Sequence, residues 1–169
     1  MKSPLEKCSR NASESDPLSP SPSAAVAPDG VLVFRFLIAE DNEVNQELFK
    51  AMLKALCRCE IDIVGNGREA VIAWSGGSYA LILMDCQMPE MDGYQASGLI
   101  REGERAAGES GTGLHTPIIA LTGYATADAR EQCLAAGMDD YLSKPLTLSQ
   151  LKSALIRWLP DYAAPADNR

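Results

Sequence analysis

Between residues 33 and 160 the chain alternates five times between a short apolar run and a segment with helical periodicity. The apolar runs have the length of strands and are continuous, as is typical of strands buried on both faces of a sheet. They are residues 33–39, 61–64, 80–84, 118–121 and, more weakly, 140–143. Strands that alternate with helices usually pair in parallel, with the helices covering both faces. The pattern therefore predicts a doubly wound α/β fold with a five-stranded parallel sheet and five helices.

Each predicted helix is marked by apolar residues three or four positions apart. The last helix is the clearest, because Thr147 is a typical N-cap residue and Pro160 a typical stop. The apolar positions are Val44, Leu48, Met52 and Ala55; Ala70, Val71 and Trp74; Ala96, Leu99 and Ile100; Ala129, Cys133 and Ala136; and Leu148, Leu151, Leu155 and Trp158. Gly137 predicts the end of the fourth helix. The polar, Gly-rich residues 101–117 predict the end of the third helix and then a long exposed loop.

The first 30 residues differ in composition from the rest of the chain. They contain five prolines and seven serines and almost no large apolar side chain. Such a segment cannot bury enough apolar surface to offset the entropy lost on ordering. We therefore expect residues 1–30 to be a disordered leader or linker, residues 31–160 to be one folded domain and residues 161–169 to be a short tail.

Charge and cysteine content exclude several classes of protein. The net charge is −8 and no cluster of lysine and arginine occurs, so nucleic acid binding is not expected. The apolar run at 31–39 is interrupted by Arg35 and is too short to cross a bilayer, so no membrane contact is expected. The five cysteines form no disulfide framework and no signal peptide pattern is present, which predicts a cytoplasmic location.

Polar side chains follow the carboxyl ends of four predicted strands. Glu40 and Asp41 follow the first strand, Asp85 the third, Thr122 the fourth and Lys144 the fifth. In an open parallel sheet these ends lie along one edge, where the ligand crevice forms. We therefore expect three carboxylates, a hydroxyl and an ammonium group to meet there.

This set of groups suits phosphoryl transfer. Three neighbouring carboxylates repel one another and need a cation or a raised pKa, and their hard oxygen ligands suit Mg²⁺, which also binds phosphate oxygens. If Asp85 attacked a phosphoryl group, the metal would screen the two anions. Lys144 and Thr122 would hold the remaining phosphoryl oxygens. The product would be an aspartyl phosphate.

Four segments carry a family resemblance. In this order and spacing, the chain resembles the receiver domain of two-component response regulators over residues 33–160, in particular receivers attached to hybrid sensor histidine kinases. The segments are FLIAEDNEVNQELFKAML, LILMDCQMPEMDGY, PIIALTGYA and MDDYLSKPL. The resemblance implies a flavodoxin-like topology with strand order 2-1-3-4-5.

The resemblance also implies a role for individual residues. It makes Asp85 the phosphoacceptor, and it makes the Lys144–Pro145 peptide bond cis, an option open to proline. The metal ligands it implies are Glu40, Asp41, Asp85 and the backbone carbonyl of Gln87. The groups it implies for phosphoryl contact are Thr122 and Lys144. Tyr141 matches the aromatic residue that moves inward when Thr122 turns toward the phosphate.

The implied function is a signalling switch controlled by phosphorylation. A sensor histidine kinase or a histidine phosphotransfer protein would donate the phosphoryl group, and the chain would act as a monomer or weak dimer. Its own catalysis would be limited to phosphorylating and slowly dephosphorylating itself. The single histidine, His115, lies in the predicted exposed loop, so any histidine kinase activity would belong to a parent protein. The chain reads either as the receiver portion of a hybrid kinase or as a single-domain response regulator.

Three other functions compete with this interpretation. An aspartate-nucleophile phosphatase would carry a second acid at position 87, where this chain has Gln87. A flavin or nucleotide binder would need a phosphate cradle after the first strand, where this chain has the anionic AEDNE. A pseudo-receiver would only bind partners, and the complete set of site residues disfavours it. Cys57, Cys59 and Cys86 are interpreted as thiols that pack without binding metal.

Overall fold

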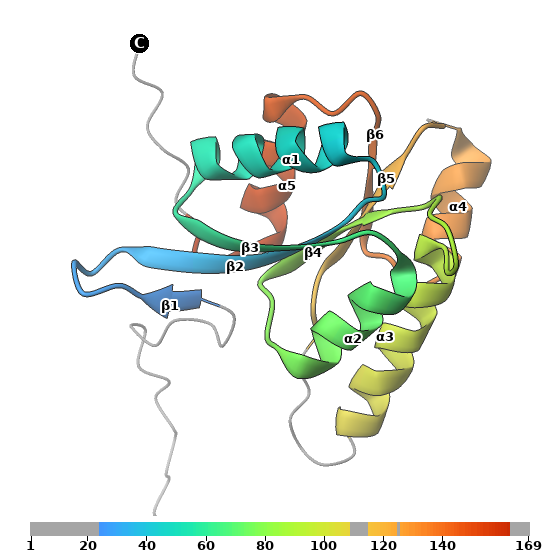
Figure 1. Cartoon of the computed structure of the whole chain (residues 1–169), viewed down its shortest axis with the longest axis horizontal. Coiled ribbons are helices and arrows are strands. Elements are labelled where there is room, and N and C mark those ends of the chain that lie inside the picture. The colour runs from blue at the N-terminus through green and yellow to red at the C-terminus, as the bar shows by residue number, and fades with distance from the viewer. Residues whose placement is uncertain (1–23, 109–114, 125, 163–169) are drawn as a thin grey trace, which may run out of the picture.

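The computed structural model describes residues 24–108, 115–124 and 126–162, and these residues form one mainly parallel sheet with helices on both faces (Figure 1). The strands are β1 (Ala24–Val26), β2 (Leu32–Ala39), β3 (Cys59–Val64), β4 (Leu81–Asp85), β5 (Ile118–Thr122) and β6 (Asp140–Ser143). The helices are α1 (Glu43–Leu56), α2 (Gly67–Gly76), α3 (Gly93–Gly108), α4 (Ala127–Ala135) and α5 (Leu148–Trp158).

The five parallel strands lie in the order β3-β2-β4-β5-β6. Counted without β1, this is the order 2-1-3-4-5, so the predicted doubly wound fold is confirmed. Helices α1 and α5 cover one face of the sheet, and α2, α3 and α4 cover the other. Alternate residues of β4 face opposite cores: Leu81 and Leu83 pack under α1 and α5, and Ile82 and Met84 under the other three helices. Burial on both faces explains why the strands are continuously apolar.

Helix α1 buries a different face from the one its first stripe indicated. Val44 is 77% exposed and Leu48 is also exposed. The buried residues are Phe49, Leu53 and Leu56, which have the same helical spacing. The stripe at 44–55 was therefore a correct sign of a helix but the wrong buried face. The face with Phe49 is buried because its bulkier side chains remove more apolar area from water than Val44 and Leu48 would.

Strand β1 falls inside the segment that was expected to be disordered. Ala24 pairs antiparallel with Phe34, and the hairpin turn closes through a hydrogen bond from the Ala27 amide to the Val31 carbonyl (2.9 Å). Asp29 forms an ion pair with Arg58. The expectation of disorder is thus wrong for residues 24–26. Residues 1–23 and 163–169 lie outside the described part of the chain, and the proposed leader and tail boundaries stay predictions.

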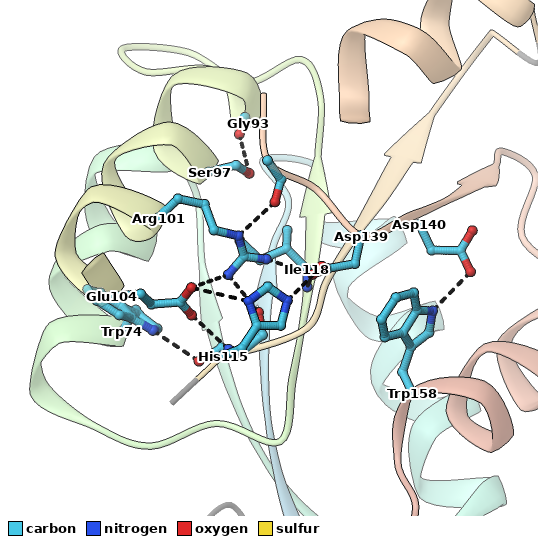
Figure 2. Close-up of polar contacts among 12 residues, drawn as sticks. Trp74, Gly93, Ser97, Arg101, Glu104, His115, Ile118, Asp139, Asp140 and Trp158 are labelled. Atoms are coloured by element: carbon cyan, nitrogen blue, oxygen red, sulfur yellow. Dashed lines mark hydrogen bonds and ion pairs between the residues drawn. The ribbon is translucent and has the colours of Figure 1, made fainter. Parts of the chain in front are cut away.

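Helix α3 runs to Gly108, eight residues beyond Ile100, whereas the sequence predicted its end near residue 101. Figure 2 shows the reason, which is the position of Arg101. Its guanidinium donates hydrogen bonds to the Gly137 carbonyl (2.7 Å), the Asp139 carboxylate (2.6 Å) and Glu104 (2.7 Å). These contacts fix the second half of the helix against the segment before β6. Residues 109–114 of the predicted loop lie outside the described residues.

His115 was predicted to be an exposed loop residue, but its side chain contacts a carboxylate. Its Nε2 lies 2.6 Å from a carboxylate oxygen of Asp139, and its side chain is about half exposed (Figure 2).

In the ranges that the structure describes, no helix combines the length and the apolar character that crossing a bilayer requires.

Candidate functional site

The carboxyl ends of the parallel strands lie level with one another. Ala39 of β2 is opposite Met84 of β4, and the next β4 residue, Asp85, is opposite Leu121 of β5. Thr122 is in turn opposite Ser143, the last residue of β6. The residues that end or follow these strands therefore meet at one edge of the sheet, as the sequence predicted.

Lys144 joins two of the predicted carboxylates. Its Nζ donates a hydrogen bond to Glu40 (2.7 Å) and another to Asp85 (2.8 Å). Glu40 is 1% exposed and Asp85 6% exposed, so both carboxylates are largely removed from water. Residues 40 and 144 are 104 positions apart in the chain, and only the fold brings them together. The peptide bond between Lys144 and Pro145 is cis, which confirms that prediction.

Glu40, Asp41 and Asp85 form an acidic cluster, in which one carboxylate oxygen of each lies within 4.8 Å of the others. Asp41 is exposed, so the cluster is open on one side. Hard oxygen donors with an open side match Mg²⁺, which binds a few carboxylates and keeps several waters. The donor set therefore fits a magnesium ion. Gln87 is adjacent, and its backbone amide donates a hydrogen bond to Asp85 (3.1 Å).

The sequence did not single out the residues that orient Glu40. One oxygen of Glu40 accepts hydrogen bonds from the Asn42 amide (3.2 Å) and the Asn45 side chain (3.1 Å). The Gln46 side chain donates to the Glu40 backbone carbonyl (2.6 Å). These residues belong to the N-cap and first turn of α1, where free backbone amides and polar side chains gather. The polar run EDNEVNQ was the available signal.

Burial and the neighbouring charges shift the pKa of two site residues in the same direction. Burial raises the pKa of Asp85, and the hydrogen bond from Lys144 only partly opposes this effect. Burial alone would lower the pKa of Lys144, but the hydrogen bonds to Asp85 and Glu40 outweigh it and raise the pKa. Lys144 is therefore held as an ammonium group between the two acids.

Close packing fixes the backbone of Asp85. A Cβ atom at Gly93, the first residue of α3, would lie 2.1 Å from the Asp85 carbonyl oxygen and 2.9 Å from Met84. No side chain can occupy that space. The turn between them contains Glu90, whose φ of 64° is left-handed. Helix α3 thus begins directly against the strand end that carries the carboxylate.

Thr122 shares a cleft of about 410 Å³ with Asp85 and Lys144. Its buried hydroxyl oxygen accepts a hydrogen bond from the Tyr124 amide (3.1 Å). Tyr141 does not line this cleft. It lies half-buried on β6, with Arg130 of α4 5.9 Å above its ring, and the movement suggested for it stays a prediction.

The thiols lie where packing residues were expected. Cys57 directly follows α1 and Cys59 begins β3, and both are half-buried, whereas Cys86 is buried beside Cys133.

Comparison with known proteins gives a consistent result. Residues 36–156 match the sequence model of the response regulator receiver domain. Hybrid signal transduction histidine kinase B of Dictyostelium discoideum is 39% identical over an alignment of 137 residues, and the match covers 79% of this chain and 7% of that protein. The chain spans no more than 16% of the length of the curated relatives it matches first.

Two solved structures are similar over most of the described residues. One is the receiver domain of sensor histidine kinase PA1611 from Pseudomonas aeruginosa, with a magnesium ion coordinated in its active-site cleft (40% identity, TM-score 0.63, 75% of this chain and 98% of that one). The other is the receiver domain of the Saccharomyces cerevisiae response regulator Ssk1, crystallised with the histidine phosphotransfer protein Ypd1 (31% identity, TM-score 0.70, 79% and 93%).

Proposed function

Because the chain belongs to the response regulator receiver domain family of two-component phosphorelays, we propose that Asp85 is the residue that accepts the phosphoryl group. One observation carries this proposal. Of the three acids in the cluster, Asp85 alone both ends a central strand and lines the cleft together with Thr122 and Lys144. Glu40 is oriented by α1, and Asp41 is exposed at the open side.

The side chains present can carry out the transfer. A carboxylate oxygen of Asp85 attacks the phosphorus of a donor phosphohistidine, and the phosphorus–nitrogen bond breaks with its electrons going to the imidazole. The Lys144 ammonium, freed from part of its contact with Asp85, holds a phosphoryl oxygen as charge moves onto it. The Thr122 hydroxyl donates to another. A magnesium ion, when bound, would neutralise negative charge on the phosphoryl group and the carboxylates.

The metal and its ligands form a further part of the proposal. Glu40, Asp41 and Asp85, with the backbone carbonyl of Gln87, would hold Mg²⁺. The support is the acidic cluster of this chain and the magnesium ion in the cleft of the PA1611 receiver domain. The chain would catalyse only its own phosphorylation and slow dephosphorylation.

The donor would be a sensor histidine kinase or a histidine phosphotransfer protein. The complex of the Ssk1 receiver domain with Ypd1 supports the second kind of partner. The chain would be either the receiver portion of a hybrid kinase or a single-domain regulator, and would act as a monomer or weak dimer. We also propose a cytoplasmic location, since the five cysteines of the sequence form no disulfide framework.

The test compares Asp85→Asn with Asp92→Asn. Asp92 lies just before α3 and caps it through the Gln95 amide, and asparagine caps a helix equally well. The purified proteins are incubated with acetyl phosphate and Mg²⁺, and their intact masses are measured. The parent and Asp92→Asn should each gain one phosphoryl group, about 80 Da, that hydroxylamine removes. Asp85→Asn should gain none, and chelation of the metal should abolish labelling of the parent. Equal labelling of Asp85→Asn would refute the assignment.

A further inference from the structure

Two buried thiols face each other directly behind the proposed phosphorylation site. Cys86 follows Asp85 in the chain, and Cys133 lies on the inner side of α4. Their sulfur atoms are 3.8 Å apart, although the residues are 47 positions apart in the sequence. Cys86 is 3% exposed and Cys133 1% exposed. Neither thiol has a part in the proposed phosphoryl transfer.

We propose that Cys86 and Cys133 form a reversible disulfide that draws α4 toward the end of β4 and slows phosphorylation of Asp85. The disulfide itself is a modification site that stands on the geometry of the two thiols. Its effect on phosphorylation rests on the proposed function. In a reducing compartment the two thiols would stay reduced until an oxidant is present.

The geometry indicates which element would move. A sulfur–sulfur bond is about 2.05 Å long, so the two atoms must approach by roughly 1.8 Å. Cys86 is fixed, because its amide donates to the Leu121 carbonyl (3.0 Å) and its carbonyl accepts from the Gly93 amide (3.2 Å). Helix α4 buries only Ala129 and Cys133. The helix is therefore the element that shifts.

A shift of α4 would narrow the site. One side of the cleft of about 410 Å³ is formed by Asp85, Cys86 and Gln87. The other side includes residues at the start of α4 and along it, namely Thr126, Asp128, Ala129 and Gln132. A covalent link between the two sides would reduce the space for an entering phosphoryl group. Misplacement by about 1 Å can cost a reaction roughly a hundredfold in rate.

The oxidation is balanced with hydrogen peroxide as the oxidant. Cys86 is among the residues that line the cleft, and we propose that peroxide enters by that route. The Cys86 sulfur attacks one peroxide oxygen and the oxygen–oxygen bond breaks. The products are a sulfenic acid on Cys86 and one molecule of water. The Cys133 sulfur then attacks the Cys86 sulfur, the sulfur–oxygen bond breaks, and a second water leaves. The two thiols lose two electrons and two protons, and a dithiol reductant returns them.

The reaction is expected to be slow. Both thiols are buried, which limits the access of peroxide to either sulfur. Oxidation should therefore be followed over hours. Cys57 and Cys59 are half-buried and can also react with peroxide, so the product has to be mapped to residues.

The first experiment maps the disulfide in the full chain. The parent is treated with excess hydrogen peroxide, digested without reductant and analysed by mass spectrometry. A cross-linked pair of peptides that contain Cys86 and Cys133 should appear, lighter by about 2 Da than the sum of the two free peptides. Dithiothreitol should separate them. Cys57→Ala should still form the cross-link, whereas Cys133→Ala and Cys86→Ala should not. Absence of the cross-link in the parent would overturn the proposal.

The second experiment measures labelling by acetyl phosphate and Mg²⁺. The oxidised parent should label at least about tenfold more slowly than the reduced parent, and reductant should restore the rate. Cys86→Ala should label at the same rate before and after peroxide treatment, because it can form neither the sulfenic acid nor the disulfide. A cross-linked parent that labels at the reduced rate would refute the regulatory effect. If the reduced parent did not label at all, the proposed function would be refuted. The mass-spectrometric experiment would still show whether Cys86 and Cys133 form a disulfide.

Discussion

Replacement of Lys144 by methionine tests the electrostatics of the site without any phosphoryl donor. Methionine keeps much of the length of lysine but removes the ammonium group that bonds Glu40 and Asp85 at 2.7 and 2.8 Å. The two carboxylates, which lie within 4.8 Å of each other, would then face one another with no cation between them. We expect a large loss of stability in the absence of metal.

The magnitude follows from distance and burial. At 4.8 Å and an effective dielectric constant of about 20, two unit charges repel by about 3.5 kcal/mol. Removing one partner of a buried ion pair costs about 3–5 kcal/mol. The Lys144 side chain is 23% exposed and Asp41 leaves the cluster open to water, so we expect a loss below that range, about 2–3 kcal/mol. For a chain of this size, that lowers the melting temperature by about 5–10 °C.

The assay is thermal unfolding at pH 7 and low ionic strength, with and without Mg²⁺. Magnesium at 100 times its dissociation constant would return up to about 2.7 kcal/mol, and it should stabilise Lys144→Met more than the parent. Lys50→Met is the control, because Lys50 bonds Glu47 at a similar 2.9 Å on the exposed side of α1 and should contribute under about 0.5 kcal/mol. A loss below about 1 kcal/mol for Lys144→Met, or equal effects of Mg²⁺ on the variant and the parent, would contradict the electrostatic account.

Two further predictions concern stability and do not involve Lys144 or magnesium. Gly93→Ala should destabilise the protein by about 3 kcal/mol, since the new methyl group meets the Asp85 carbonyl at 2.1 Å, whereas Gly98→Ala in the same helix has no neighbour within 4 Å and should stabilise by roughly 1 kcal/mol. Urea unfolding gives both values, and shifts of equal sign would contradict the packing. Burial and the hydrogen bond to Asp62 raise the pKa of Tyr79 to about 12. As the pH rises, Tyr79 loses its proton in the unfolded chain first, near pH 10. This ionisation favours the unfolded state, so the free energy of unfolding should fall between about pH 10 and 12. Tyr79→Phe should reduce that fall, and an unchanged slope would count against the shift.

The strands that are buried on both faces were the most predictable part of the fold. The run 118–121 corresponds to β5 (Ile118–Thr122), and all five of its residues are buried. Strand β1 could not be found in this way, because Ala24–Val26 is a run of only three small apolar residues and two of them are exposed. It forms because β2 begins at Leu32 but pairs with β4 only from Phe36, which leaves an edge free for a hairpin. That edge is a property of the assembled sheet.

Helical periodicity predicted where α1 lies but not which side it buries. Val44 and Leu48 have the same spacing as Phe49 and Leu53, and only packing under the sheet distinguishes the two stripes. The length of α3 was missed for a related reason. A polar, Gly-rich sequence lowers intrinsic helix propensity, and the bonds of Arg101 to Gly137 and Asp139 override it.

The positions of the site residues could be predicted from the sequence, but the contacts between them could not. Topology alone brings the strand ends together, so Glu40, Asp85, Thr122 and Lys144 could be placed at one edge from the order of their strands. The bonds from Asn45 to Glu40, and from Lys144 to both acids, depend on side-chain conformations and on where α1 begins. No periodic pattern in the sequence encodes them.

The partners of the carboxylates separate this site from another cluster of ionised side chains in the described part of the chain. Near β6, Arg101 lies between Glu104 and Asp139, and these two carboxylates also accept bonds from the Thr116 and Ile118 amides (Figure 2). One guanidinium, two amides and the adjacent histidine leave those acids fully partnered inside the fold.

At the carboxyl edge of the sheet, three carboxylates face the single ammonium group of Lys144, which gives a formal charge of 1 − 3 = −2. Asp41 leaves this cluster open to water, and the cleft lies beside it. A divalent cation balances that charge, and a phosphoryl group can then approach Asp85 without meeting uncompensated carboxylates. The cluster around Arg101 is fully hydrogen-bonded and holds the fold together, whereas the cluster at the carboxyl edge keeps a formal charge of −2 and an open side, which suits it to bind a cation.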